Sequence, residues 1–238
     1  MNTSEDTVRI ARESRYGRIA SLYEWGAYWG SGGQIQESKK YHLNLVTEPS
    51  RILYPGVGWG KEVVLAAKAG HHPTVVELDS VMFEKSTSIF KAEGVLDKIE
   101  CIQGNVLNHQ RSGEYDVVVA SYLLDVFSPN VMFQVYEHLV NQLKDGGMLT
   151  LSGYAPLNGS FLHRMVQTIN HAYANLFCKL VVNNAVHGIY DYSQYYSKFR
   201  LTPVCERDFP HFATFGPRFH RFWAARKSGV NPGGELHQ

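Results

Sequence analysis

A short glycine-rich segment between an apolar strand and an apolar helix most constrains the fold of this chain. The segment reads Tyr54-Pro-Gly-Val-Gly-Trp-Gly60, with glycines at alternate positions. The residues before it, Ile52–Tyr54, have the pattern of a buried strand, and Val63–Ala67 after it has helical apolar spacing. Glycines at such a turn let the backbone bend tightly, and they let a ligand approach the helix amino terminus without interference from a Cβ.

A second apolar strand ends in a carboxylate. Thr74–Val76 is followed by Glu77, about 20 residues after Gly56, where an acid can accept hydrogen bonds from both hydroxyls of a ribose. The dinucleotide-binding pattern needs its third glycine at the position of Lys61, so the segment favours a different nucleoside cofactor. The alternative is a glycine-rich turn that binds no ligand, and it leaves Glu77 unexplained.

The rest of the chain alternates between strand and helix patterns, which predicts a doubly wound α/β sheet. Asp79 and Ser80 are expected to cap the helix after the second strand, Gly94 to end it, and Lys144–Gly147 to end a later helix. The last two strands form a hairpin that adds an antiparallel strand. Further strands are expected at 99–103, 115–121, 148–151, 201–207 and 219–226, and helices at 81–93, 131–143 and 161–182.

Three regions are expected along the chain. Residues 1–46 form a helical amino-terminal lid rich in tyrosine and tryptophan, and residues 47–228 form the α/β domain, with an insertion at 154–199. Residues 229–238 are rich in glycine and polar residues and form a disordered tail.

Composition excludes several classes of partner. The formal net charge of +1 gives no basic surface for nucleic acid, and no apolar run approaches the length of a membrane span. Acidic residues stand near the amino terminus, where a signal peptide would be basic and then apolar. Three widely spaced cysteines, Cys101, Cys178 and Cys205, give neither a disulfide framework nor a zinc pattern. We expect a cytoplasmic protein with buried thiols and no metal site.

Four segments resemble the motifs of the class I S-adenosylmethionine-dependent methyltransferases. They are Tyr54–Gly60, Val75–Met82, Gln103–Asn105 and Tyr115–Tyr122. Tyr16–Tyr23 is similar to the opening of many small-molecule methyltransferases. The resemblance covers roughly residues 16–226. It implies a Rossmann-like, doubly wound, seven-stranded and mostly parallel sheet with an antiparallel last strand, a helical amino-terminal lid, and a helical insertion between strands five and six.

The resemblance also implies S-adenosyl-L-methionine as the cofactor. Glu77 stands where the family binds the ribose, Asn105 where it contacts the adenine amino group, and Ser121 where it faces the methionine part. Tyr23 stands where a tyrosine helps to close over the cofactor. The full set of residues that this implies is Tyr23, Tyr54, Gly56, Gly58, Gly60, Glu77, Leu78, Asn105, Val106 and Ser121.

Two positions depart from the family pattern. Tyr54 stands where the family usually has an acid near the cofactor's amino group, so that ammonium must rest on backbone carbonyls, water or another side chain. Asn105 replaces the common aspartate, and its amide carbonyl can still accept a hydrogen bond from the adenine amino group.

The sequence says less about the methyl acceptor, because methyl transfer mainly needs a nucleophile held in line with the methyl group. Asp125, just beyond the fourth strand, is a candidate substrate base, or else a helix cap or solvated loop acid. His187 is a weaker candidate, because a lone histidine is more often structural or exposed. The tyrosines of Tyr190–Tyr196 either stack on a planar substrate or pack against the sheet.

The leading hypothesis is therefore a methyltransferase that acts on O, N or C of a small aromatic or heterocyclic metabolite, as a monomer or homodimer. One alternative is a catalytically silent module that binds S-adenosylmethionine. Another is a fold relative that uses the sulfonium for chemistry other than methyl transfer, and the tyrosine at position 54 keeps it open. A nicotinamide oxidoreductase and a nucleic-acid methyltransferase are disfavoured by Lys61 and by the balanced charge, respectively.

Overall fold

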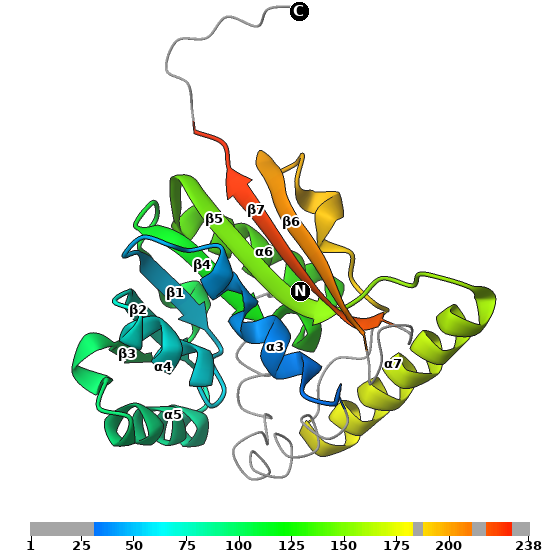
Figure 1. Cartoon of the computed structure of the whole chain (residues 1–238), viewed down its shortest axis with the longest axis horizontal. Coiled ribbons are helices and arrows are strands. Elements are labelled where there is room, and N and C mark those ends of the chain that lie inside the picture. Colours follow the sequence, from blue (N-terminus) through cyan, green and yellow to red (C-terminus); the bar gives the residue numbers. More distant parts are fainter. Residues whose placement is uncertain (1–30, 183–187, 211–217, 230–238) are drawn as a thin grey trace, which may run out of the picture.

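The computed structural model describes residues 31–182, 188–210 and 218–229. They form a seven-stranded sheet with strand order β3-β2-β1-β4-β5-β7-β6 (Figure 1). Neighbouring strands pair in parallel except that β7 runs antiparallel to both β5 and β6, so the predicted fold class is confirmed. The strands are β1 (Arg51–Pro55), β2 (His72–Glu77), β3 (Glu100–Gln103), β4 (Tyr115–Ser121), β5 (Leu143–Tyr154), β6 (Leu201–Pro210) and β7 (Arg218–Lys227).

The order of the strands reverses between β1 and β4, which lie side by side although β2 and β3 separate them in the chain. At such a switch point the connections leave in opposite directions, and a crevice opens beyond the carboxyl ends of the strands. The glycine-rich segment follows β1 at this point. The fold therefore places the motif where open α/β sheets bind ligands.

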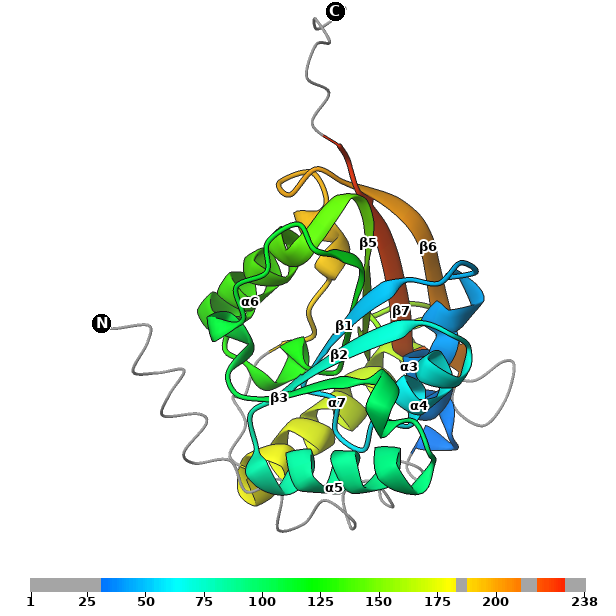
Figure 2. The same ribbon diagram turned by 90° about the vertical axis from the view of Figure 1, so that its left-hand side faces the viewer.

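Helices cover both faces of the sheet. Figure 2 shows α3 and α4 on one face and α6 on the other. On the face that α4 covers, Tyr54 and Phe222 of the sheet pack in one core cluster with α4 and α5. On the opposite face, Trp223 of β7 shares a core cluster with Tyr136 of α6. The helices are α3 (Gln34–Lys40), α4 (Lys61–Lys68), α5 (Ser80–Ala92), α6 (Pro129–Gln142) and α7 (Phe161–Val182), with single 3₁₀ turns η1 (Tyr41–Asn44), η2 (Leu96–Lys98), η3 (Val106–Asn108), η4 (Leu124–Val126) and η5 (Tyr192–Tyr195).

The predicted helix signals act as expected around α5. The Asp79 carboxylate accepts a hydrogen bond from the Met82 N–H at 2.9 Å, and Gly94 ends the helix with φ +68°. One boundary differs. Lys144–Gly147 does not form a turn after α6 but belongs to β5, which begins at Leu143. The extra residues of β5 lie where its pairing with β4 is irregular, between the pairs Tyr115–Leu143 and Val117–Met148. A bulge there lets β5 carry more residues than β4.

The aromatic segment after α7 is part of the core. Tyr190, Tyr192 and Tyr196 are each at most 8% exposed, and they pack against the face of the sheet that α6 covers. Of the two interpretations of this cluster, packing against the sheet is the one observed. Cys101 and Cys205 are free thiols, and they are half-buried rather than buried.

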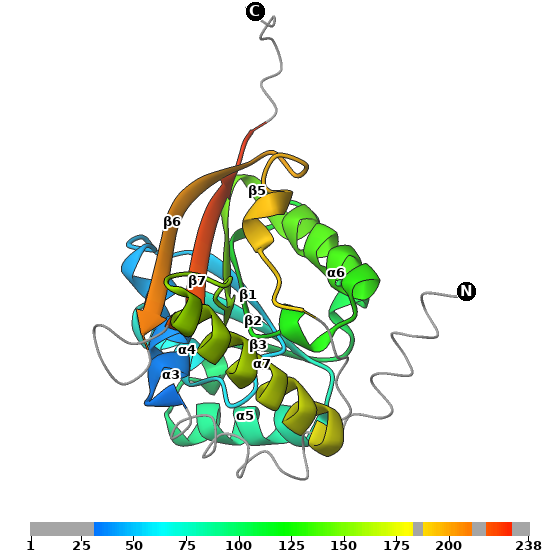
Figure 3. The same ribbon diagram turned by 90° about the vertical axis from the view of Figure 1, so that its right-hand side faces the viewer.

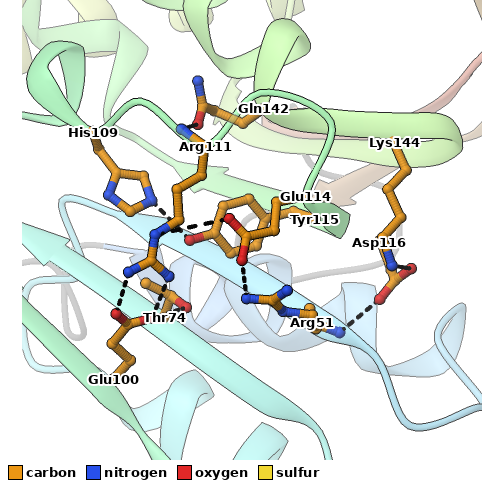
Figure 4. Close-up of polar contacts among 10 residues, drawn as sticks. All are labelled: Arg51, Thr74, Glu100, His109, Arg111, Glu114, Tyr115, Asp116, Gln142 and Lys144. Atoms are coloured by element: carbon orange, nitrogen blue, oxygen red, sulfur yellow. Dashed lines mark hydrogen bonds and ion pairs between the residues drawn. The ribbon is translucent and has the colours of Figure 1, made fainter.

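A charged network lies at the amino ends of the strands, away from the glycine loop (Figure 4). The Arg111 guanidinium donates to both oxygens of Glu100, at 2.7 and 2.5 Å. Lys144 pairs with Asp116 at 2.8 Å. Partial burial by itself raises the pKa of Asp116, but hydrogen bonds from Lys144 and from the Arg51 N–H outweigh it, so the pKa is lowered. These contacts join β1, β3 and β4 at their starts and leave the opposite edge for the site.

The tyrosines and tryptophans between positions 16 and 29, residues 211–217, which join the last two strands, and the tail from residue 230 lie outside the described residues. Within the described part of the chain, none of the helices combines the length and apolar character needed to cross a membrane.

Candidate cofactor and acceptor site

The glycine loop has a backbone that only glycine adopts easily. Gly56, Gly58 and Gly60 have φ values of +62°, +58° and +67°, in the left-handed region. The Gly56 N–H donates to the Val76 carbonyl at 2.9 Å, which ties the loop to β2. A Cβ at Gly60 would lie 2.6 Å from the ring of Phe90, so the third glycine also allows α5 to pack closely under the loop.

Glu77 lies beside this loop. It is the last residue of β2 and is 8% exposed. Burial raises the pKa of its carboxyl group, and hydrogen bonds from the backbone N–H groups of Asp79, Gly58 and Leu78 oppose that rise. The structure thus brings a buried carboxylate against the second glycine, in the arrangement that a ribose-binding acid needs.

The other predicted cofactor residues end neighbouring strands at the same edge. Asn105 follows β3, and its side-chain oxygen accepts the Leu107 N–H at 2.9 Å, which leaves a second lone pair for a ligand. Ser121 ends β4, and its buried Oγ has no hydrogen-bond partner among the described residues. Leu78 is exposed, whereas Val106 is buried in the core.

Tyr54 forms a hydrogen bond with His42 of η1. Its hydroxyl lies 2.7 Å from Nε2 of His42, and Nδ1 of His42 lies 2.8 Å from the Lys39 carbonyl oxygen. A carbonyl only accepts, so Nδ1 carries the proton and Tyr54 donates to Nε2. Burial lowers the pKa of His42 to about 4 and raises the pKa of Tyr54 well above its usual value. Both groups are therefore neutral near pH 7.

A cavity of about 190 Å³ lies between α3 and the glycine loop. Glu62, the second residue of α4, lines it and is 7% exposed. Lys39 from α3 faces this carboxylate, with Nζ 3.9 Å from Oε1. The sequence analysis did not single out Glu62 or His42, and the only signal for them was the missing acid at position 54.

On the acceptor side, Asp125 lies in η4 beyond the end of β4. Its Oδ1 accepts a hydrogen bond from the Tyr192 hydroxyl at 2.8 Å. Its Oδ2 lies 2.6 Å from where a Cβ would stand at Gly153 in β5, so the absence of a side chain there gives the carboxylate its room. Asp125 is thus at the expected edge and held by the aromatic segment. Tyr23 and His187 lie outside the described residues.

Sequence reasoning missed a cluster of two tyrosines and two histidines at this edge. The His220 ring centre lies 5.7 Å from that of Tyr122 and 5.9 Å from that of Tyr154, whose ring lies 5.0 Å from His171. Both histidines are at most 9% exposed. Four elements meet here, because Tyr122 follows β4, Tyr154 ends β5, His220 begins β7, and His171 is on α7, which crosses this end of the sheet (Figure 3).

The backbone at Tyr122 is strained, since its φ of +57° is in the left-handed region that a bulky residue avoids. Its hydroxyl lies 2.9 Å from Oγ of Ser38 in α3, and its N–H donates to the Ser152 carbonyl at 2.7 Å. The antiparallel pairing of β5 with β7 sets Tyr154 opposite His220. The sequence pattern predicted an antiparallel strand but not its partner, so it gave no signal for this cluster.

Parts of this chain match a family model and curated proteins. Residues 52–147 match the family model described as a methyltransferase domain. The curated tRNA 5-carboxymethoxyuridine methyltransferase of Escherichia coli is 24% identical over 165 residues, which cover 65% of this chain and 61% of that protein. The chain thus matches less than two thirds of the length of this relative. Ribosomal protein L11 methyltransferase of Exiguobacterium is 32% identical over 111 residues, 46% of this chain and 34% of that one.

Solved structures share the fold. The 1,6-didemethyltoxoflavin-N1-methyltransferase of Burkholderia thailandensis, with bound S-adenosylhomocysteine, is 14% identical with a TM-score of 0.64, and the likeness covers 96% of this chain and 92% of that one. Mitomycin 7-O-methyltransferase is 15% identical with a TM-score of 0.60, over 85% and 54% of the two chains. The matched domain includes the glycine loop and Glu77. The chain therefore contains a segment that matches a methyltransferase domain, and it shares its fold with S-adenosylmethionine-dependent methyltransferases.

Proposed function

We propose that this protein transfers a methyl group from S-adenosylmethionine to O, N or C of a small aromatic or heterocyclic molecule. The observation that carries the proposal is the meeting of the glycine loop and the cluster of Tyr122, Tyr154, His171 and His220 at one edge of the sheet. Aromatic and imidazole rings at the ends of β4 and β5 and near the start of β7 suit a flat acceptor with polar substituents.

The residues at the carboxyl ends of β1 to β4 fit the cofactor. Glu77 has a buried carboxylate for the ribose hydroxyls, and the glycine loop has no Cβ atoms in the path of a ligand. Ser121 has a buried hydroxyl whose hydrogen-bonding capacity no described residue uses. S-adenosylmethionine supplies an electrophilic methyl group on a sulfonium, so these residues need only hold and orient it.

The acceptor side would orient the nucleophile and exclude water. Direct displacement at a methyl group requires the nucleophile to lie in line with the breaking C–S bond, so positioning supplies much of the rate. A nucleophile that arrives protonated must also lose a proton. His220 in the aromatic cluster and Asp125 in η4 are the candidates to accept it.

A second candidate substrate is a modified nucleoside in tRNA, because the matched Escherichia coli relative is a tRNA 5-carboxymethoxyuridine methyltransferase. The net charge of +1 argues against it, since binding to nucleic acid draws on a surplus of basic side chains. The solved structures that carry small-molecule names cover more of this chain than that relative does.

The first experiment is isothermal titration of the purified protein with S-adenosylhomocysteine, with NADH as the control ligand. We expect micromolar binding of the first ligand alone. Transfer from labelled S-adenosylmethionine is then measured with a panel of phenols and nitrogen heterocycles and with bulk tRNA. Methylation of tRNA alone would contradict the proposed acceptor, and bound nucleoside without transfer to any acceptor would indicate a silent module. Transfer of a group other than methyl would show in the product mass.

A further inference from the structure

We propose that Glu62 binds the α-ammonium group of the cofactor's methionine end and Lys39 its α-carboxylate, in the cavity between α3 and the glycine loop. This inference rests on the proposed function and adds the residues that replace the acid missing at position 54.

The end of β1 offers no charge for an ammonium group. Tyr54 is 2% exposed, and its hydroxyl proton is donated to Nε2 of His42. His42 is itself fully buried and neutral. Both side chains are thus committed to each other. Their hydrogen bond joins η1 to β1, and the hydrogen bond from His42 to the Lys39 carbonyl joins η1 to the end of α3.

Glu62 carries a negative charge next to the same strand. It is two residues beyond Gly60, and its side chain is 8% exposed. Among the described residues, its carboxylate has one ion pair, with Lys39 at 3.9 Å, and no hydrogen bond accompanies that long contact. A buried carboxylate usually gains hydrogen bonds that offset its desolvation, so this one has unused acceptor capacity.

Two more polar atoms at the cavity have no partner among the described residues. They are the Trp59 Nε1–H donor and the Gln36 Oε1 acceptor, both buried. The Trp59 ring is held in place by the ammonium groups of Lys85 and Lys61, which lie 4.1 and 5.3 Å from its centre. Unpaired buried donors and acceptors are rare in folded proteins and indicate an unfilled partner.

These four groups match a zwitterion. An ammonium can lie between the Glu62 carboxylate and Gln36 Oε1, and a carboxylate can accept from Lys39 and Trp59 Nε1–H. With the amino-acid end between Glu62 and Lys39, its ammonium would face the Glu62 carboxylate and its carboxylate would face the Lys39 ammonium. Without it, the two side chains face each other across 3.9 Å. The cavity of about 190 Å³ borders Gly60, so a cofactor whose ribose lies at Glu77 can extend along the loop into it.

The test compares three nucleosides by isothermal titration to the full chain. S-adenosylhomocysteine has the complete amino-acid end, its decarboxylated analogue 5′-(3-aminopropylthio)-5′-deoxyadenosine keeps only the ammonium, and 5′-methylthioadenosine has neither group. Glu62→Gln should weaken the first two by roughly 10- to 100-fold, the range for losing a charged hydrogen bond, and leave the third unchanged. Lys39→Met should weaken S-adenosylhomocysteine alone.

Unchanged binding of 5′-methylthioadenosine also reports that each variant is folded. The control is Glu37→Gln, which removes an exposed carboxylate paired with Lys40 on the same helix and should change none of the three affinities. Wild-type protein that binds all three nucleosides while Glu62→Gln weakens none, or all equally, would overturn this inference and leave the proposed function intact. Wild-type protein that binds none of them would overturn both.

Discussion

At the scale of single residues, the site depends on where charge is buried. Glu77 keeps a carboxylate at 8% exposure because three backbone N–H groups surround it. At position 54, by contrast, no charge is buried. Tyr54 and His42 form a neutral hydrogen-bonded pair at the place where the resembling methyltransferases usually have an acid. A buried carboxylate lies instead on α4, at Glu62, two residues beyond Gly60.

Replacing Glu77 with alanine should weaken S-adenosylhomocysteine binding by about 1–3 kcal/mol, because a buried acceptor for the ribose hydroxyls is lost. Titration calorimetry measures the change. Glu84→Ala, which removes an exposed carboxylate from α5, is the control and should bind as wild type does. An unchanged affinity in Glu77→Ala would mean that the ribose lies elsewhere.

Asp125→Asn tests the acceptor side. Asparagine keeps the oxygen that accepts from Tyr192 and removes the charge, so the local structure should survive. If Asp125 takes the nucleophile's proton, turnover of an acceptor from the panel should fall by about 10²–10⁴-fold, while S-adenosylhomocysteine affinity stays the same. Wild-type turnover would identify Asp125 as an anchor for the aromatic segment, and His220→Asn, measured in the same assay, would then be the informative variant.

At the scale of elements, the turn between β1 and α4 is the most constrained part of the fold. All three glycines have left-handed φ, but the space around them differs. A Cβ at Gly60 would meet Phe90 of α5, and a Cβ at Gly56 would meet the end of the Leu123 side chain. The loop is therefore specified both by its backbone conformation and by the side chains that pack around it.

Gly60→Ala should destabilise the protein more than Gly94→Ala does. Both positions have nearly the same φ, +67° and +68°, so both substitutions carry the left-handed strain of about 1–2 kcal/mol. Only at position 60 does the new Cβ collide with another side chain, while nothing lies within 4 Å at position 94. We expect an additional loss of about 1–3 kcal/mol in Gly60→Ala, measured by urea unfolding. Equal losses would mean that Phe90 moves aside without cost.

At the scale of the whole molecule, acid stability should depend on His42. Its pKa is 6.5 when exposed in the unfolded chain and about 4 in the fold, because burial disfavours the charged ring. The stability that comes from its neutral form is complete above pH 6.5 and is lost as the pH falls toward 4. The free energy of unfolding should decrease by about 3 kcal/mol over this window.

The variant His42→Gln isolates this contribution. The buried carboxyl of Glu77 acts in the opposite direction, because its raised pKa makes the fold relatively more stable at low pH. Urea unfolding of wild type and variant at several pH values between 4 and 6.5 separates the two, since only the histidine's share disappears in the variant. Parallel curves for the two proteins would contradict a neutral buried His42.

The amino-acid sequence by itself determined the architecture of this protein. Strand and helix periodicity predicted all seven strands and the order of strands and helices along the chain. This was possible because apolar periodicity, glycine stops and acidic helix caps are local signals. The long helix Phe161–Val182 was predicted to the residue. The segments that resemble methyltransferase motifs lie mostly within residues 52–147, which match a methyltransferase domain model. Glu77 was singled out because it ends a strand, and the resemblance added Asn105 and Ser121, which lie near the ends of two others. Their roles toward the cofactor stay predictions.

Only the tertiary structure brought together residues that are far apart in the chain. Lys39 meets Glu62 and His42 meets Tyr54 because α3 and η1 lie on the face of the sheet that α4 also covers, and no local pattern predicts which helix lies on which face. Tyr122, Tyr154, His171 and His220 come from four elements whose ends coincide once β7 has entered the sheet between β5 and β6. The loop and its acid follow from local backbone chemistry, whereas the charges and rings around them depend on long-range packing, which the whole fold decides.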